Sequence, residues 1–130
     1  MQRTEATNNA TNTSTISNLV LEGHALLNAS RFEEALILYD KVLKLDPKSV
    51  EALNGKGVIL NQLGKYEDAI IWFDKALEIN PDFIDAMYNK ADALGELGKY
   101  EESLKWTDRA LTLNPALQNN SNSNVLLPND

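Results

Sequence analysis

Histidine and cysteine, two residue types that often carry out reactions in enzymes, are nearly absent from this sequence. The chain of 130 residues contains one histidine, His24, and no cysteine. A serine–histidine–acid triad would have to use His24, and the spacing places no serine or orienting carboxylate beside it. The chain also lacks the set of cysteines and histidines that a structural zinc site requires. We therefore expect no catalytic residue, no metal site and no bound cofactor.

Two further patterns resemble chemical motifs without matching them. Glycine and lysine adjoin at residues 55–57 and 64–65, but neither segment has the spacing of a phosphate-binding loop, which ends in Gly-Lys followed by Ser or Thr. Acidic pairs recur at residues 33–34, 67–68 and 101–102. A recurring acidic pair is typical of helix starts, where carboxylates interact favourably with the helix dipole. These patterns predict a protein that is not an enzyme.

The charge balance argues against two classes of partner. The chain has 12 lysines and arginines against 19 aspartates and glutamates, which gives a formal net charge of −7. Nucleic acids and anionic membranes would repel such a chain. No apolar run approaches the roughly 18 residues that span a bilayer, and the N-terminus lacks the features of a secretory signal. We expect a cytoplasmic protein that binds neither nucleic acid nor membrane.

A pattern of 34 residues occurs three times in succession. Residues 31–35, Arg-Phe-Glu-Glu-Ala, align with residues 65–69 and 99–103 at this offset. The same offset relates three leucines and three prolines, which are Leu43, Leu77, Leu111, Pro47, Pro81 and Pro115. The pattern divides the chain into three units at residues 16–49, 50–83 and 84–117. The flanking segments, 1–15 and 118–130, contain many Thr, Asn and Ser residues and are predicted to be flexible.

Each unit is predicted to form two helices. In the second unit, Leu53 and Leu60 recur at helical spacing before glycine and lysine interrupt at residues 64–65. A second amphipathic stretch, with Phe73 on its apolar face, ends before Pro81 because proline disfavours helical geometry in the preceding residue. The pattern predicts six helices, at residues 17–28, 32–45, 51–62, 66–79, 85–96 and 100–113. Since one hairpin cannot bury its own apolar face, the hairpins must stack into an all-α solenoid.

In these features the sequence resembles the tetratricopeptide repeat family, whose pattern also spans 34 residues. The resemblance covers residues 16–117. The small residues of the pattern are Gly23, Gly57, Ala91, Ala35, Ala69 and, as a departure, Ser103; its aromatic positions hold Tyr39, Phe73 and, as a departure, Thr107. The family's early Trp is replaced by Leu19, Leu53 and Met87, and its following Leu by Glu22, Lys56 and Lys90. The resemblance implies a right-handed α-solenoid of three antiparallel helix hairpins, a TPR-like superhelix that binds proteins.

In this family the first helix of each unit lines a curved inner surface that binds a protein or peptide. The resemblance therefore implies partner-binding residues at Val20, His24, Leu27, Glu51, Asn54, Val58, Asn61, Asp85, Tyr88, Asn89, Asp92 and Glu96. Some members clamp a C-terminal carboxylate with Lys, Asn and Arg. The matching positions here hold Val20, His24, Gly55, Asp85 and Asn89. Because Asp85 would repel an anion, we do not expect this chain to bind an acidic chaperone tail.

Four acidic residues and one asparagine, in the third unit and just before it, are predicted to form a stripe along one helix face. Asp82, Asp85, Asn89, Asp92 and Glu96 follow one another at intervals of three and four residues. Two interpretations remain open: a plain solvated face, or a groove that accepts a segment with lysine or arginine and apolar anchors. Trp72 and Trp106 occupy equivalent positions on the second helices and are predicted to lie toward the outer face.

The last predicted helix supports an alternative, structural function. Leu104, Leu111 and Leu113 would present apolar surface there, and no seventh amphipathic helix follows. Either residues 125–127, Val-Leu-Leu, fold back onto this surface, or a second copy of the chain covers it. In the second case self-association is part of the function. A longer repeat array would cover the same surface.

Overall fold

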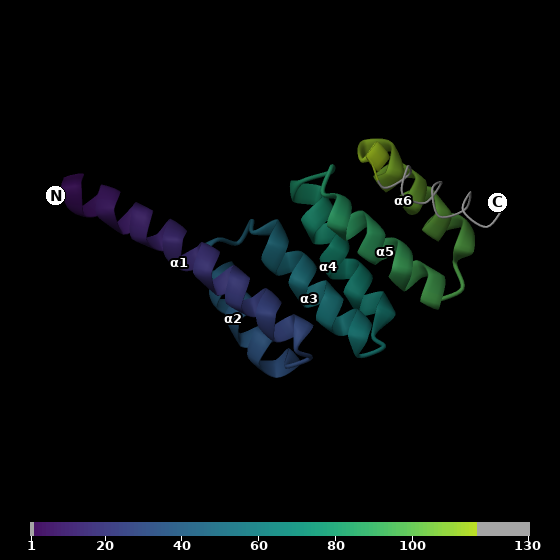
Figure 1. Ribbon diagram of the computed structural model, residues 1–130, viewed down its shortest axis with the longest axis horizontal. Coiled ribbons are helices and arrows are strands. Elements are labelled where there is room, and N and C mark those ends of the chain that lie inside the picture. Colours follow the sequence, from purple (N-terminus) through teal and green to yellow (C-terminus); the bar gives the residue numbers. More distant parts are fainter. Residues whose placement is uncertain (1, 117–130) are drawn as a thin grey trace, which may run out of the picture.

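Six α-helices make up the part of the chain that the computed structural model describes, residues 2–116, with side chains described from residue 12 onward. They are α1 (Gln2–Asn28), α2 (Phe32–Leu45), α3 (Val50–Gln62), α4 (Tyr66–Ile79), α5 (Ile84–Glu96) and α6 (Tyr100–Leu113). The helices pair as hairpins, α1 with α2, α3 with α4 and α5 with α6, and the hairpins stack in chain order (Figure 1). The predicted all-α architecture of consecutive helix hairpins is confirmed.

Five of the six helices begin and end within one residue of the predicted positions. The exception is α1, which begins at Gln2, whereas we predicted a flexible segment over residues 1–15 and a helix from residue 17. Threonine and asparagine are weak helix formers. However, the turns of α1 that pack on α2 supply a nucleus, and each further residue only extends an existing hydrogen-bond ladder. The extension projects beyond the stack in Figure 1. The predicted flexible tail at residues 118–130 lies outside the described residues.

The chain turns within each hairpin at a residue with left-handed backbone. Gly64 and Gly98 have φ angles of 80° and 79°, and Ser30 occupies the equivalent position with a φ of 60°. The next amide closes each turn by donating to the carbonyl five residues earlier, as in Lys65 N to Leu60 O at 2.8 Å. Glycine is therefore the fitting residue at this position, and Ser30 is strained.

Aromatic rings of the second helices fill gaps left by glycines of the first helices. Tyr39 on α2 is buried, and its ring lies against the backbone at Gly23 of α1 and Gly55 of α3. A Cβ atom at residue 55 would lie 2.5 Å from that ring. Phe73 on α4 packs on Gly57 of α3 in the same way. Because the Tyr39 ring contacts its own hairpin and the next, it fixes how the two hairpins stack.

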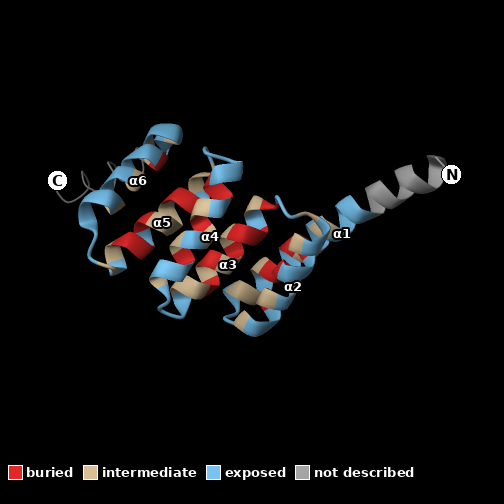
Figure 2. Ribbon diagram, turned by 180° about the vertical axis from the view of Figure 1, so that it is seen from behind, coloured by how far each residue is buried: buried red, intermediate tan, exposed pale blue. Residues whose placement is uncertain are grey.

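Buried side chains are distributed along the stack rather than gathered at one centre. One cluster joins the first hairpin to α3 and contains Val20, Ala35, Tyr39, Val42, Ala52 and Ile59. A second joins the last two hairpins and contains Leu53, Ala76, Leu77, Ala86, Met87 and Ala110. Figure 2 shows buried residues along α3, α4 and α5 and mostly exposed residues on α6, where Ala110 alone is buried. The last helix is therefore covered on one side only.

Adding a methyl group at Gly55 should destabilise the stack. In Gly55→Ala the new Cβ would collide with the Tyr39 ring, so the free energy of unfolding should fall by about 1–3 kcal/mol. Gly95→Ala is the matched control, because its Cβ would meet only Ser103 Oγ at 3.7 Å. Alanine favours helix more than glycine, so the control should be neutral or stabilising by up to about 1 kcal/mol. Urea unfolding measures both; equal effects would contradict the proposed collision.

Relieving the backbone strain at Ser30 should stabilise the chain. Glycine adopts a φ of 60° without the steric penalty that serine carries there. Ser30→Gly should therefore raise the free energy of unfolding by roughly 0.5–1 kcal/mol, net of glycine's greater freedom in the unfolded state. The same urea titration provides the measurement. A lower stability of this variant would show that the left-handed turn is not strained.

Candidate interaction surface

The first helices of the hairpins, α1, α3 and α5, form one face of the stack, here called the inner face, along which three hollows lie. Helix α3 contacts both α1 and α5. The first hollow, about 380 Å³, is lined by Ile16, Ser17, Val20, Leu21, His24 and Glu51. The second, about 370 Å³, is lined by His24, Leu27, Asn28, Glu51, Asn54, Gly55, Val58, Phe83 and Asp85. The third, about 450 Å³, is lined by Tyr88, Ala91, Asp92, Gly95, Glu96, Tyr100, Ser103 and Thr107.

Ten of the twelve residues that we predicted to bind a partner line these hollows. Six of them surround the second hollow: His24, Leu27, Glu51, Asn54, Val58 and Asp85. Tyr88, Asp92 and Glu96 lie apart from these six, around the third hollow. Val20 borders the first hollow, but it is only 7% exposed and packs mainly in the core. Asn61 and Asn89 line none of the three hollows.

Asparagine side chains of the inner face hold α3 to α5. Asn89 Nδ2 donates to Asn54 Oδ1 at 3.0 Å, and Asn61 Nδ2 donates to Asp92 Oδ2 at 2.7 Å. Asn61 Oδ1 is buried and accepts no hydrogen bond from the residues that the structure describes. These four side chains, which we predicted to bind a partner, therefore use part of their hydrogen-bonding capacity in contacts between α3 and α5.

The only histidine is bonded to the ring that joins the first two hairpins. His24 Nδ1 lies 2.6 Å from the Tyr39 hydroxyl oxygen. Burial raises the pKa of Tyr39 from its ordinary value of 10.0 to about 12, because the phenolate would be poorly solvated. Tyr39 therefore stays protonated at neutral pH, and its hydroxyl contacts His24, which lines the first and second hollows. This bond fixes the orientation of the His24 ring.

Carboxylates dominate the charge around the hollows. Glu51 borders the first two hollows, Asp85 borders the second, and Asp92 and Glu96 border the third. The residues that line the three hollows include no lysine and no arginine. A cation that enters this face would therefore meet favourable potential from several sides.

Lysines of α3 and α5 are held at the hairpin junctions instead. Lys56 Nζ lies 2.8 Å from Asp40 Oδ1 of α2 and 4.1 Å from the centre of the Trp72 ring. One repeat further on, Lys90 Nζ lies 2.6 Å from Asp74 Oδ1 and contacts the Trp106 ring in the same way. Each lysine is thus fixed by a carboxylate of the preceding hairpin and a tryptophan of its own.

Both tryptophans are half-buried, and each ring is contacted by two cations. Lys75 also stands over the Trp72 ring, at 4.1 Å, and Arg109 over the Trp106 ring, at 5.5 Å. Both rings also pack against the second core cluster. The tryptophans therefore contribute to packing at the junctions.

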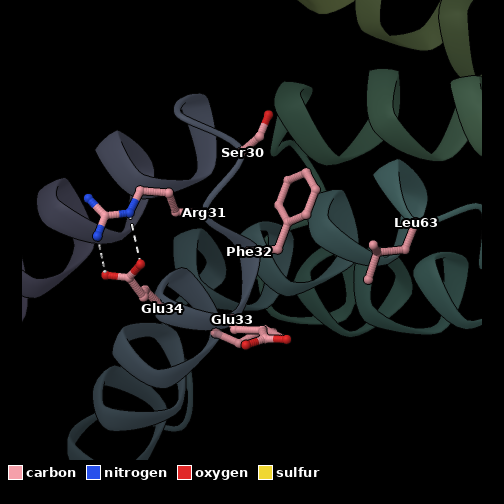
Figure 3. A pocket seen from close by; sticks show the side chains of 7 residues that line it. Ser30, Arg31, Phe32, Glu33, Glu34 and Leu63 are labelled. Atoms are coloured by element: carbon pink, nitrogen blue, oxygen red, sulfur yellow. Dashed lines mark hydrogen bonds and ion pairs between the residues drawn. The ribbon is translucent and has the colours of Figure 1, made fainter.

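A further hollow lies away from the inner face, where the first hairpin turns beside the end of α3 (Figure 3). Phe32 and Leu63 border it, and Arg31 pairs with Glu34 through two hydrogen bonds of 2.8 Å. A similar hollow recurs 34 residues later, around residues 64–68 and Leu97. Because this hollow repeats with the hairpins and its arginine is paired, it is a feature of how the hairpins stack.

Sequence reasoning missed several residues that line the hollows. Phe83 precedes α5 as its N-cap and borders the second hollow. Its position directly before a predicted inner helix was a signal that could have been used. Tyr100 and Thr107 border the third hollow from α6, a second helix, so a search confined to first helices could not find them.

The repeat pattern and the fold agree with a known family. The tetratricopeptide repeat pattern matches residues 20–83 and again residues 72–105. The chain belongs to the tetratricopeptide repeat (TPR) family. As in other TPR proteins, the unit of structure is a helix hairpin that packs on its neighbours. No curated protein sequence matches the chain. Among the described residues, no helix is both long enough and apolar enough to cross a membrane.

Several solved structures share the fold. The TPR2B domain of yeast Sti1, in complex with an Hsp70 peptide, is 25% identical; the match covers 85% of this chain and 89% of that one, with a TM-score of 0.73. The first TPR of Spaghetti (RPAP3), bound to the HSP90 peptide SRMEEVD, is 24% identical over 78% of this chain and 81% of that one, with a TM-score of 0.72. The O-GlcNAc transferase of Thermobaculum terrenum is 24% identical over 80% of this chain but only 20% of the enzyme, with a TM-score of 0.76.

Raising the pH above 10 should destabilise the fold through Tyr39. Because the folded chain holds the phenolic proton up to about pH 12, stability present below pH 10 is lost as the pH approaches 12. The loss amounts to about 1.4 kcal/mol for each unit by which the folded and unfolded pKa values differ. Urea unfolding across this range should show a smaller loss for Tyr39→Phe than for the natural chain. Tyr100→Phe, at a tyrosine that is 72% exposed, is the control and should behave as the natural chain does.

Proposed function

We propose that the chain is a non-catalytic protein-interaction module whose inner face binds an extended or helical segment of a partner protein. The segment carries lysine or arginine together with apolar residues. Membership in the TPR family and likeness to structures that hold chaperone peptides support the general function. The partner chemistry is inferred from the side chains of this chain.

The composition of the second hollow carries the proposal. Leu27, Val58 and Phe83 give it apolar walls, and all three are only half-buried, so they offer surface to a partner. Glu51 and Asp85 are exposed at its border, with no lysine or arginine among the lining residues. An apolar side chain seated in the hollow, with a cation on either side, would satisfy both features.

The same charges argue against the ligands seen in the related structures. The HSP90 peptide bound to the first TPR of Spaghetti ends in Glu-Glu-Val-Asp. In this chain Glu51 and Asp85 would repel such a tail, and the positions that could clamp a terminal carboxylate offer one amide, Asn89, which is bonded to Asn54. We expect a basic segment to bind more tightly than an acidic one.

Neutralising the two carboxylates tests this preference. A labelled peptide of alternating lysine and leucine should bind the natural chain more tightly than its glutamate-for-lysine counterpart. Glu51→Gln/Asp85→Asn should weaken binding of the lysine peptide by roughly three- to tenfold, because two nearby charges are lost while shape is kept. Fluorescence anisotropy at low and at physiological salt provides the affinities, and the difference between variants should shrink as salt rises.

A second double variant has the same net charge as Glu51→Gln/Asp85→Asn. It distinguishes attraction by the two carboxylates at the second hollow from attraction by the charge of the whole chain. Glu78→Gln/Glu101→Gln removes two exposed carboxylates from α4 and α6, outside the lining of the second hollow. This control should retain the affinity of the natural chain. If both double variants lose affinity equally, or if the natural chain prefers the glutamate peptide, the proposed role of the second hollow is wrong.

A further inference from the structure

The outward face of α6 lacks the cover that α2 and α4 receive from the helix that follows each of them. Leu36 of α2 and Ile70 of α4 are half-buried, and Leu104, at the equivalent position of α6, is 60% exposed. Tyr100 is 72% exposed, whereas Phe32 and Tyr66, its equivalents on α2 and α4, are half-buried. In the described part of the chain, the last hairpin therefore ends in an open apolar surface.

The acidic half of the junction ion pair recurs on this open surface. Asp40 and Asp74 each bind a lysine of the following first helix, at 2.8 and 2.6 Å. Asp108 stands at the next position of the 34-residue series. Its carboxylate has no partner among residues 12–116, whose side chains the structure describes. The open end thus presents an exposed carboxylate where the other junctions hold a lysine.

The third hollow occupies the space that a ring fills in the first hairpin. Thr107 stands where Tyr39 stands two units earlier. Tyr39 contacts Gly23 and is bonded to His24; the residues equivalent to these two are Ala91 and Asp92, and both line the third hollow. The missing ring therefore leaves a cavity between α5 and α6.

The Ser103 and Thr107 hydroxyl groups that line the third hollow are engaged with backbone carbonyls. The Thr107 hydroxyl donates to Ser103 O at 3.0 Å, and the Ser103 hydroxyl donates to Ala91 O at 2.7 Å. With both hydroxyl protons engaged, Thr107 and Ala91 offer their methyl groups to the hollow, beside the carboxylates of Asp92 and Glu96. A bulky side chain can contact these methyl groups in the space that the Tyr39 ring fills in the first hairpin.

We propose that this open end seats an amphipathic helix of a partner protein. The helix carries a lysine that pairs with Asp108 and, at the residue just before it, a bulky apolar side chain that enters the third hollow beside Thr107. The first junction supplies the geometry, because adjacent residues of α3 make the two contacts there: Gly55 meets the Tyr39 ring and Lys56 pairs with Asp40. At the open end Thr107 stands in place of the Tyr39 ring. The partner helix therefore carries a large residue at the position that Gly55 occupies in α3.

Neither α1 of a second copy nor the segment at residues 118–130 supplies such a helix. A second copy stacked head to tail would bring α1, whose residue equivalent to Lys56 is Glu22, against Asp108. Two carboxylates would then meet where the internal junctions have an ion pair. The residues at 118–130 include no lysine and no arginine. A partner helix is therefore the occupant that matches the charge of this surface.

A peptide copy of α5 is a suitable probe, because α5 makes the corresponding contacts on α4. The probe has the sequence of residues 82–97 with Asn89→Phe, which places phenylalanine directly before Lys90. Titrated into the full ¹⁵N-labelled chain, it should shift the amide signals of α6 around Leu104 and Asp108. Lys90→Glu in the peptide should weaken binding about tenfold, because like charges would then oppose each other.

Exchanging the two charges provides the decisive control. Asp108→Lys in the chain should weaken binding of the lysine peptide and restore binding of the Lys90→Glu peptide, a reciprocity that a merely structural effect would not produce. Thr107→Phe should weaken the phenylalanine peptide more than an otherwise identical one with Asn89 retained.

Four results would overturn the proposal. The first two are the absence of α6 shifts and an affinity that does not depend on the exchanged charges. The third is binding that emerges only after residues 118–130 are deleted, because the chain's own tail would then be the occupant. The fourth is a dimer that Leu104→Glu dissociates in sedimentation, because a second copy would then cover this surface of α6.

Discussion

The contact between the Tyr39 ring and the backbone of two successive first helices is the constraint on which the rest of the structure depends. Gly23 and Gly55 have no side chains and leave a gap that the ring fills. The Tyr39 ring and these two glycines therefore set the spacing of the first two hairpins. The same ring carries a hydroxyl that holds His24 at 2.6 Å on the inner face. Packing between hairpins and the shape of the first and second hollows therefore follow from a single contact.

Lysines of the first helices lie at the hairpin junctions, whereas carboxylates lie on the inner face. Lys56 and Lys90 lie on inner helices, yet each is bound to a carboxylate of the preceding hairpin and to a tryptophan ring. This arrangement withdraws cations from the inner face and leaves Glu51 and Asp85 without a cation among the residues that line the second hollow. The acidic character that we propose for partner binding is thus a consequence of how the hairpins are joined. At α6 the carboxylate of this ion pair, Asp108, is present, but no lysine among the described residues pairs with it.

The 34-residue period was sufficient to predict five helices closely, because glycines and prolines mark their ends at the same offset. It also placed most of the predicted inner residues around the hollows, since position within a repeat determines which face a residue occupies. It could not predict that Asn54 bonds Asn89, because that contact depends on side-chain geometry across two helices. Lys56 and Lys90 were visible only as departures from the family pattern, and the structure shows them as junction residues. The extension of α1 toward Gln2 was not predicted, because the composition of residues 1–15 indicates only a weak helix propensity. Composition does not show that a helix anchored at one end can continue through such residues.

The coupling energy between residues 39 and 55 tests most directly whether this ring joins the hairpins. Unfolding free energies of the natural chain, Gly55→Ala, Tyr39→Ala and the double variant complete the cycle. We expect the methyl group at residue 55 to be much less harmful once the ring is gone, with a coupling energy of about 1 kcal/mol or more. Additive effects of the two substitutions would mean that the ring and the glycine do not interact, and the proposed basis of hairpin stacking would be wrong.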